Sequence, residues 1–389
     1  VIVSKAGYST VSRQVYMPDR EPKSLKLTLE PVLGEVRIVG APVDADVLVD
    51  NRSVGQGQQT LTLPARAHQV RVRKAGFADF VAEVTPKPGL PQVVEVRLLT
   101  EAQAVRARTP RKVTTSQGAD LILVEPGDFK MGAPRREQGR RPNESERQVR
   151  LTRRFYIADR EVTNSQYRAF SAQHTSGAET FRELGIGDHP AVMVSWADAV
   201  AFCNWLSDQD GLPPAYIAQG GTFMLAEPAT TGYRLPTEAE WAWAARHAAG
   251  AGTDKYPWGP RMPPTRGAGN FADRSARGVL DSVLQNYDDG FPVTSPVGQF
   301  LASPLGLYDL AGNAAEWTSD LYAVGVLATG LETDPLGASK GQYHVIRGSS
   351  WRHASISELR WSFRDFGDRG RLDVGFRLAR WVDGDTPEN

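Results

Sequence analysis

Cysteine is almost absent from this chain: Cys203 is the one cysteine among 389 residues. A single thiol cannot form an internal disulfide, and the sequence holds no CxxC metal or redox motif. The six histidines are scattered and show neither HExxH nor HxH spacing. These absences exclude a disulfide-stapled scaffold and the common zinc motifs. They fit a reducing compartment, and equally a bacterial envelope protein that never used disulfides.

Net charge and long apolar runs are absent as well. The 45 basic residues balance the 45 acidic ones, which argues against a general nucleic-acid or anionic-membrane binder. No run approaches the ~18 apolar residues of a membrane span. The sequence begins at Val1 and within a repeat, so we expect a preceding N-terminal segment, which leaves room for a membrane anchor there.

Glycine, proline and tryptophan are plentiful, at 37, 26 and 9 residues. Glycine and proline at this level indicate many loops and turns. Tryptophan is large and amphipathic, which favours packed loop cores and recognition surfaces. The length predicts two or three domains.

The first hundred residues have the alternating apolar pattern of β-strands, broken by glycine and Asp-Asn turns. Residues 1–8 (VIVSKAGY) match residues 70–77 (VRVRKAGF) at an offset of 69. We therefore predict two similar β modules in tandem, residues 1–30 cut short and residues 31–100 complete. Residues 101–118 are polar without an apolar period, which predicts a linker.

The second module resembles the PEGA domain, a small β-sandwich found mostly in bacterial envelope proteins. The resemblance rests on residues 34–38 (GEVRI), the hairpin at 46–55 (DVLVDNRSVG) and the closing VRVRKAGF. It implies a spacer or adhesion module without chemistry of its own. It also implies a location on the periplasmic or extracellular face of a bacterial envelope.

Residues 119–382 have a different character, and residues 383–389 form a tail. Strands are predicted at 121–124 and 155–157. Capping boxes predict that three helices begin at Thr163, Ser195 and Thr237. Cys203 lies on the apolar face of the second helix, which favours a buried structural thiol over a nucleophile. After Trp258 the chain is loop-dominated, so bound ions or hydrogen-bond networks are expected to hold it.

An ordered series of motifs runs through this region: PGxFxMG (126–132), EVTNxxY (161–167), HPAVxVSW (189–196), YRLPTEAEW (233–241), PWG (257–259), GLYDLAGN (306–313), EW (316–317), RGSSW (347–351) and GFR (375–377). The series resembles the formylglycine-generating enzyme family of sulfatase-modifying proteins. The resemblance implies an α+β variant of the C-type-lectin-like fold with little regular structure.

Enzymes of that family bind copper through two cysteines in the C-terminal stretch and oxidise a substrate cysteine with O₂. Here those two positions are His353 and Glu358. Thiolate is the soft ligand that selects Cu(I), so we expect no copper, no copper oxidation and no catalytic residues of this kind. One alternative is an enzyme that uses His353 and Glu358 with another metal. The related sulfoxide synthases are disfavoured, because their HxxxHxE motif is absent.

The resemblance also implies two structural calcium sites. One would use Asn270, Phe271, Asp289 and Phe291; the other would use Asp309, Gly312, Ala314 and Glu316, with Asp309 in place of an asparagine. Hard oxygen ligands suit Ca²⁺. The alternative is that Asn313 and Glu316 only bond the loop backbone.

The stretch from Arg347 to Arg380 keeps the family's frame without the copper cysteines. We expect it to be mostly loop and to bind a protein or glycan partner of the envelope. The predicted contact residues are Arg352, His353, Glu358, Arg360, Trp361, Arg364 and Arg369, whose composition is typical of an interface. Some arginines, Arg347 and Arg377 above all, are instead expected to hold loops together. A diversified lectin-fold ligand-binding protein is a further alternative, although such proteins are rich in Asn here and this stretch has none.

Overall fold

The computed structural model describes residues 1–16, 24–246, 254–324 and 330–382. The tail at 383–389 lies outside the described residues. The chain divides into two units, Val1–Thr109 and the part from Pro110 onward. Among the described residues, no helix combines the length and apolar character needed to cross a membrane.

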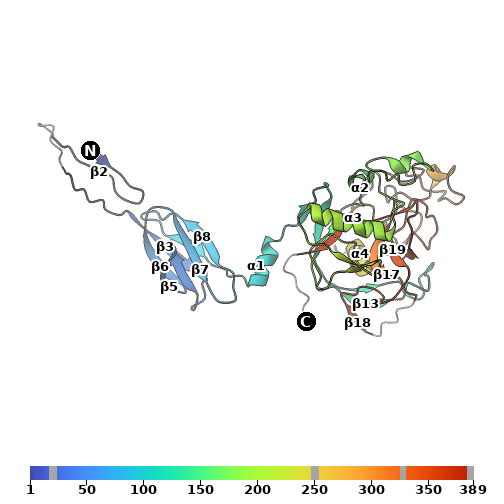
Figure 1. Cartoon of the computed structure of the whole chain (residues 1–389). Coiled ribbons are helices and arrows are strands. Elements are labelled where there is room, and N and C mark those ends of the chain that lie inside the picture. Colours follow the sequence, from blue (N-terminus) through green and yellow to red (C-terminus); the bar gives the residue numbers. More distant parts are fainter. Residues whose placement is uncertain (17–23, 247–253, 325–329, 383–389) are drawn as a thin grey trace. The chain divides into compact units, whose positions relative to one another are not determined.

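Two sheets make up most of the first unit (Figure 1). One sheet has the order β6-β3-β9, in which β3 (Leu33–Val39) pairs antiparallel with β6 (Gln59–Pro64) and parallel with β9 (Gln92–Glu95). The other has the order β5-β4-β7-β8: β5 (Arg52–Gln56), β4 (Asp46–Val49), β7 (His68–Arg73) and β8 (Phe80–Val84). Alternate apolar residues of both sheets share one core, as the period-2 pattern predicts.

The sequence repeat is also a repeat of structure. Tyr8 forms a bridge with Pro31, and Phe77 forms one with Thr100, again 69 residues further on. A backbone hydrogen bond accompanies each bridge. The N–H of Ser9 donates to the Glu30 carbonyl at 2.8 Å, and the N–H of Ala78 donates to the Leu99 carbonyl at 2.9 Å. Ahead of the first bridge, β1 (Ile2–Val3) pairs with β2 (Val11–Ser12). The same turn therefore closes both modules.

The predicted linker is partly structured, contrary to expectation. Residues Glu101–Arg108 form helix α1, and β10 (Lys112–Thr114) joins a sheet of the second unit. Thr100 and Gln103 bond each other's backbone N–H groups in a capping box that starts α1. That box satisfies helix-end donors without an apolar stripe, which is why periodicity gave no sign of the helix.

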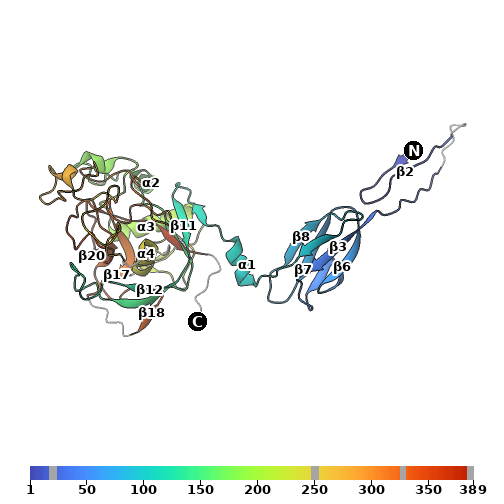
Figure 2. The ribbon, with the colours of Figure 1, turned by 180° about the vertical axis from the view of Figure 1, so that it is seen from behind.

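In the second unit, one sheet joins both ends of the unit in the order β10-β11-β14-β22: β11 is Asp120–Val124, β14 is Phe155–Ala158 and β22 is Ala379–Trp381. A second sheet has the order β20-β19-β17-β21: β20 (Arg364–Gly367), β19 (His344–Arg347), β17 (Ala315–Leu321) and β21 (Val374–Gly375) (Figure 2). Smaller sheets are formed by β12 (Asp128–Met131), β13 (Arg147–Arg150) and β18 (Leu331–Thr333), and by β15 (Tyr216–Gln219) with β16 (Thr222–Leu225).

The three helices begin where the capping boxes place them: α2 (Asn164–Phe170), α3 (Trp196–Gln209) and α4 (Glu238–Arg246). Short 3-10 turns lie at Arg182–Gly185 and Arg274–Ala276. Cys203 on α3 is fully buried against an aromatic and aliphatic cluster. Burial raises the pKa of its thiol, so the prediction of a structural thiol is confirmed.

Loops dominate the described residues 254–314, as predicted. Backbone hydrogen bonds hold them; the N–H of Asn313, for example, donates to the carbonyl of Asn270 at 2.8 Å. Gly312 has φ of +85°, and a Cβ there would lie 2.3 Å from that same carbonyl oxygen. Only glycine fits this crossing of two loops. The stretch from Arg347 to Arg380 is less irregular than expected, since it supplies β20, β21 and β22.

Candidate functional site

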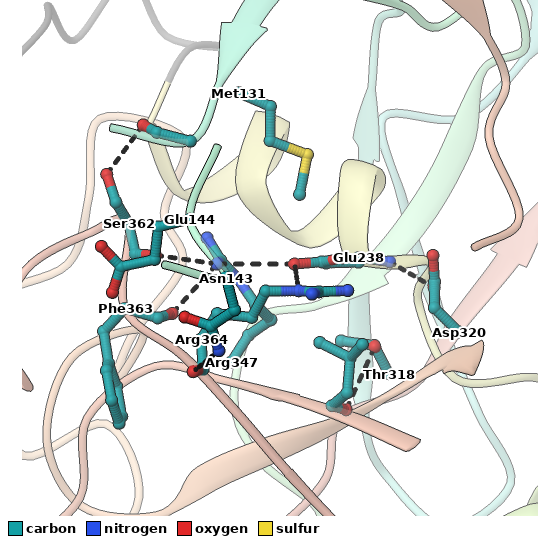
Figure 3. Close-up of polar contacts among 12 residues, drawn as sticks. Met131, Asn143, Glu144, Glu238, Thr318, Asp320, Arg347, Ser362, Phe363 and Arg364 are labelled. Carbon is teal, nitrogen blue, oxygen red and sulfur yellow. Dashed lines mark hydrogen bonds and ion pairs between the residues drawn. The ribbon is translucent and has the colours of Figure 1, made fainter. Parts of the chain in front are cut away.

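A buried carboxylate at the start of α4 gathers three arginines from three strands. Two of them, Arg347 and Arg364, are labelled with Glu238 in Figure 3. The Glu238 side chain is 1% exposed and accepts a hydrogen bond from Arg364 Nε at 2.7 Å. Arg147 Nη2 lies 3.4 Å and Arg347 Nη1 3.6 Å from its carboxylate oxygens. One glutamate thus joins α4 to β13, β19 and β20.

Burial and charge oppose each other in this Glu238 network. Burial disfavours the charged form of Glu238, but Arg364, Arg147 and Arg347 outweigh it and lower the pKa of Glu238. Asp320 accepts a hydrogen bond from the Glu238 N–H at 2.6 Å. Burial and the nearby charge of Glu238 raise the pKa of Asp320 to about 7.

A cavity of about 30 Å³ lies within the network, lined in part by Asn143, Arg347, Ser362 and Arg364. Arg347 Nε and Asn143 Oδ1 are both buried without a hydrogen-bond partner among the protein atoms. A donor and an acceptor facing a space of this size suit one or two ordered waters. The Glu238 network therefore has a structural role, because it links α4 to three strands. Its cavity is too small for an organic ligand.

The predicted contact residues do not form one exposed face. Arg352 and Arg369 are exposed, and Glu358 and Trp361 are half-buried. In contrast, His353, Arg360 and Arg364 are buried. Arg360 donates to Glu137 and to Glu144, each at 2.8 Å. The prediction is wrong for these three as surface residues, because each side chain is taken up by partners inside the unit.

Two exposed apolar residues of the same loops escaped the sequence analysis, Ile356 at 38% and Phe366 at 40% exposure. Phe366 stacks on Tyr322 with ring centroids 4.1 Å apart and contacts Tyr343 at 5.4 Å. It sits on a strand, β20, where alternate residues point to opposite sides.

The two copper positions of the family hold side chains already engaged in the loops. His353 Nδ1 accepts a hydrogen bond from the Ser350 N–H at 3.1 Å, and burial lowers the pKa of His353. Glu358 accepts a hydrogen bond from Ser355 Oγ at 2.7 Å. Within the described ranges, no group of three His, Cys, Asp or Glu side chains is arranged to hold a metal.

Two side chains of the second predicted calcium site, Asp309 and Glu316, lie close to a third carboxylate, Glu161. Arg377 donates two hydrogen bonds to the Glu316 carboxylate, from Nη2 at 2.6 Å and from Nε at 2.7 Å. The unpartnered buried oxygens are Asp309 Oδ1 and Glu161 Oε2. Burial and the charge of Asp309 raise the pKa of Glu161, and burial raises that of Asp309 to about 6. The carboxylate oxygens of Asp309 and Glu161 are of the donor type that suits a hard cation.

The first predicted calcium site gathers around Asp289. The N–H groups of Phe271 and Phe291 each donate to its carboxylate at 2.9 Å, and burial raises its pKa to about 7. Asn270 donates to the Val293 carbonyl at 2.7 Å, and its buried Oδ1 has no hydrogen-bond partner. The donor types fit Ca²⁺ here too.

The model of the sulfatase-modifying factor enzyme 1-like domain matches residues 106–382. The chain belongs to this family. A second match, to the PEGA domain, covers residues 33–101. Both resemblances proposed from the sequence motifs are confirmed, and the β-rich chain carries an N-terminal PEGA domain and a C-terminal formylglycine-generating-enzyme-like domain.

Curated relatives of this domain include formylglycine-generating enzymes. That of Bos taurus is 35% identical over 197 residues, 49% of this chain and 44% of its own length. That of Thermomonospora curvata is 34% identical over 199 residues, 49% of this chain and 55% of its own length. The chain thus spans about half the length of these relatives.

Solved structures support the fold of the second unit. Treponema denticola variable protein 1 matches with a TM-score of 0.57 and 26% identity, covering 70% of this chain and 99% of that one. PvdO from Pseudomonas aeruginosa matches with a TM-score of 0.53 and 23% identity, covering 71% and 100%. The second of these carries information on the fold alone.

Proposed function

We propose that this chain is a non-catalytic member of its family, a binding protein of the bacterial envelope. The observation that carries the proposal is the identity of the two copper positions, His353 and Glu358. Neither is a thiol, and both side chains are engaged within their own loops. Cys203 offers no substitute, because it is fully buried on α3.

The partner, a protein or a glycan, is bound by the exposed residues of the C-terminal loops in a C-type-lectin-like fold. We propose the exposed residues Arg352, Ile356, Phe366 and Arg369 as the contact residues and refer to them together as the contact face. It combines two exposed cations with two exposed apolar side chains, the combination found at interface centres. The PEGA domain serves as a spacer between this head and an envelope anchor.

Calcium has a structural role in the proposal. Asp309 and Glu161 each present a buried oxygen without a hydrogen-bond partner, and a cation there would neutralise their charge. Adding Ca²⁺ is expected to raise the melting temperature and EGTA to lower it. Glu161→Gln should shrink that difference; an equal response in the variant and the parent would remove Glu161 from the site.

Oxygen consumption decides the catalytic part of the proposal. The purified chain is loaded with Cu(I) and given a cysteine-containing peptide, and O₂ uptake and bound copper are measured. We expect no stoichiometric copper and no uptake above the peptide-free control. Copper at one per chain with peptide-dependent uptake would refute the proposal.

A pull-down from envelope extract tests the contact face. Arg352→Ala combined with Phe366→Ala should reduce recovery of the partner at least tenfold. Arg277→Ala, an exposed arginine of the same unit outside the C-terminal loops, is the matched control and should leave recovery unchanged. Equal recovery with the double variant and the control would exclude this face.

A further inference from the structure

A ligand-sized cavity lies among the loops of the second unit and shares no described lining residue with the contact face. Its volume is about 310 Å³. Its described lining consists of Ala245, Asp254, Tyr256, Pro257, Trp258, Thr265, Ala268, nine residues between Phe300 and Ala311, and Trp361. Small-molecule sites span roughly 300–1,000 Å³ and are mostly apolar with a few polar groups. Nothing in the family's copper chemistry accounts for this cavity.

Two half-buried indoles form the principal flat walls. The ring of Trp258 lies parallel to Tyr256, with centroids 5.2 Å apart and an angle of 2°, and its Nε1 donates to the Arg261 carbonyl at 2.8 Å. The backbone N–H of Trp361 donates to the Lys255 carbonyl at 3.1 Å, which joins the two segments that carry the indoles. The Trp258 indole is thus held by its own contacts, and Trp361 is held at its backbone, so binding a ligand needs little ordering of these walls.

The third wall is tied in the same way. The N–H of Leu301 donates to the carbonyl of Gly267 at 3.3 Å, which joins the 300–311 loop to the 265–268 loop. Leu301 itself is 75% exposed. Neighbouring residues between Asp254 and Ala268, the 300–311 loop and Trp361 thus form one preorganised cavity with an apolar rim.

The charges around the cavity disfavour an anion. The described lining holds no Lys, Arg or His, so an anion would find no counter-charge there. The carboxylates of Asp254 and Asp309 would attract a cation, so a cationic probe has to be compared with neutral ones. The lining also offers the hydroxyls of Tyr256, Thr265 and Ser303 as hydrogen-bonding groups for a neutral ligand.

We propose that this cavity binds a neutral terminal hexopyranose of an envelope glycan. A pyranose ring has an apolar face of C–H groups, which suits the fixed indoles of Trp258 and Trp361. Its hydroxyls can donate to Asp254 and exchange hydrogen bonds with Thr265 and Ser303. The inference rests on the proposed binding function for its envelope setting and names the ligand class and a site for it.

Saturation-transfer NMR on the whole chain tests the assignment. The neutral probes are the methyl glycosides of glucose, galactose, mannose and N-acetylglucosamine, and the charged probes are ethylammonium and acetate. At least one glycoside should bind saturably, and the charged probes should not. Ala302→Trp, which fills the cavity from an exposed lining position, should weaken that binding at least tenfold, as should Trp258→Ala. Trp205→Phe, at a half-buried tryptophan of α3, should not change it.

Three outcomes would overturn the inference: no glycoside binds, ethylammonium binds in preference, or Ala302→Trp binds the glycoside like the parent. None of these outcomes bears on the contact face, which is tested separately by partner recovery with the Arg352→Ala and Phe366→Ala double variant. Conversely, loss of partner recovery with glycoside binding intact separates the two sites. Copper-dependent oxygen uptake would refute the proposed function while leaving the cavity's glycoside binding to be decided by these same spectra.

Discussion

Glu238→Gln is the sharpest test of the Glu238 network. The substitution keeps the shape of the side chain and removes its charge. Three guanidinium groups, those of Arg364, Arg147 and Arg347, would then lose their shared counterion. The loss is costly because the Glu238 side chain is only 1% exposed. Removing one partner of a buried ion pair costs roughly 3–5 kcal/mol. For a unit of this size the loss corresponds to a melting temperature lower by roughly 6–20 °C.

Tryptophan fluorescence in urea is the assay, because all nine tryptophans lie between Trp196 and Trp381. The signal therefore reports the second unit and not the PEGA domain. The matched control is Asp128→Asn, which removes the exposed pair with Arg150 across β12 and β13. Exposed pairs contribute little, so its midpoint should stay close to that of the parent.

The pH dependence follows from the lowered pKa of Glu238. A lowered pKa means that the stability from this carboxylate is present above its ordinary value of 4.5 and is lost as the pH falls through the folded-state value. The gap between parent and Glu238→Gln should be widest at neutral pH and shrink in acid. A gap no larger than that of the Asp128→Asn control at pH 7 would refute the reasoning.

Three further predictions concern single buried positions. The pKa of Asp320 is raised to about 7, so its ionisation destabilises the fold as the pH rises from about 4 toward 7; Asp320→Asn should therefore gain melting temperature relative to the parent at pH 8 and not at pH 4. Gly312→Ala should lower the unfolding free energy by about 2 kcal/mol or more, since φ is +85° and the new Cβ would meet a carbonyl oxygen at 2.3 Å; an unchanged urea midpoint would contradict that crossing of loops. Cys203 should react with a thiol reagent only as fast as the unit unfolds, and rapid labelling of the native chain would show that α3 is not packed as described.

Local signals in the sequence predicted the local structure well. Capping boxes placed the starts of α2, α3 and α4, and alternation placed the strands of the PEGA domain, because both depend on residues close in the chain. The motifs that identified both families are likewise short runs of residues that are close in the chain.

Partner choice across long separations could not be predicted. Arg360 and Arg364 have the composition of a contact surface, yet their carboxylate partners lie more than a hundred residues earlier, in Glu144 and Glu238. A sequence shows that a charge is present and not whether another charge neutralises it. The nearness of Glu161 to Asp309 was missed for the same reason, since it arises only when the loops fold together.

The pairing of β22 with β14 has a consequence during translation. The strand at Ala379–Trp381 completes the sheet begun by β11, so the second unit lacks a sheet strand until almost its whole length has left the ribosome. The PEGA domain needs nothing beyond Thr109 and can fold while the rest is still being made. A premature stop within the second unit, after Pro110 and before Trp381, would thus yield a folded leading module joined to an incomplete and aggregation-prone remainder.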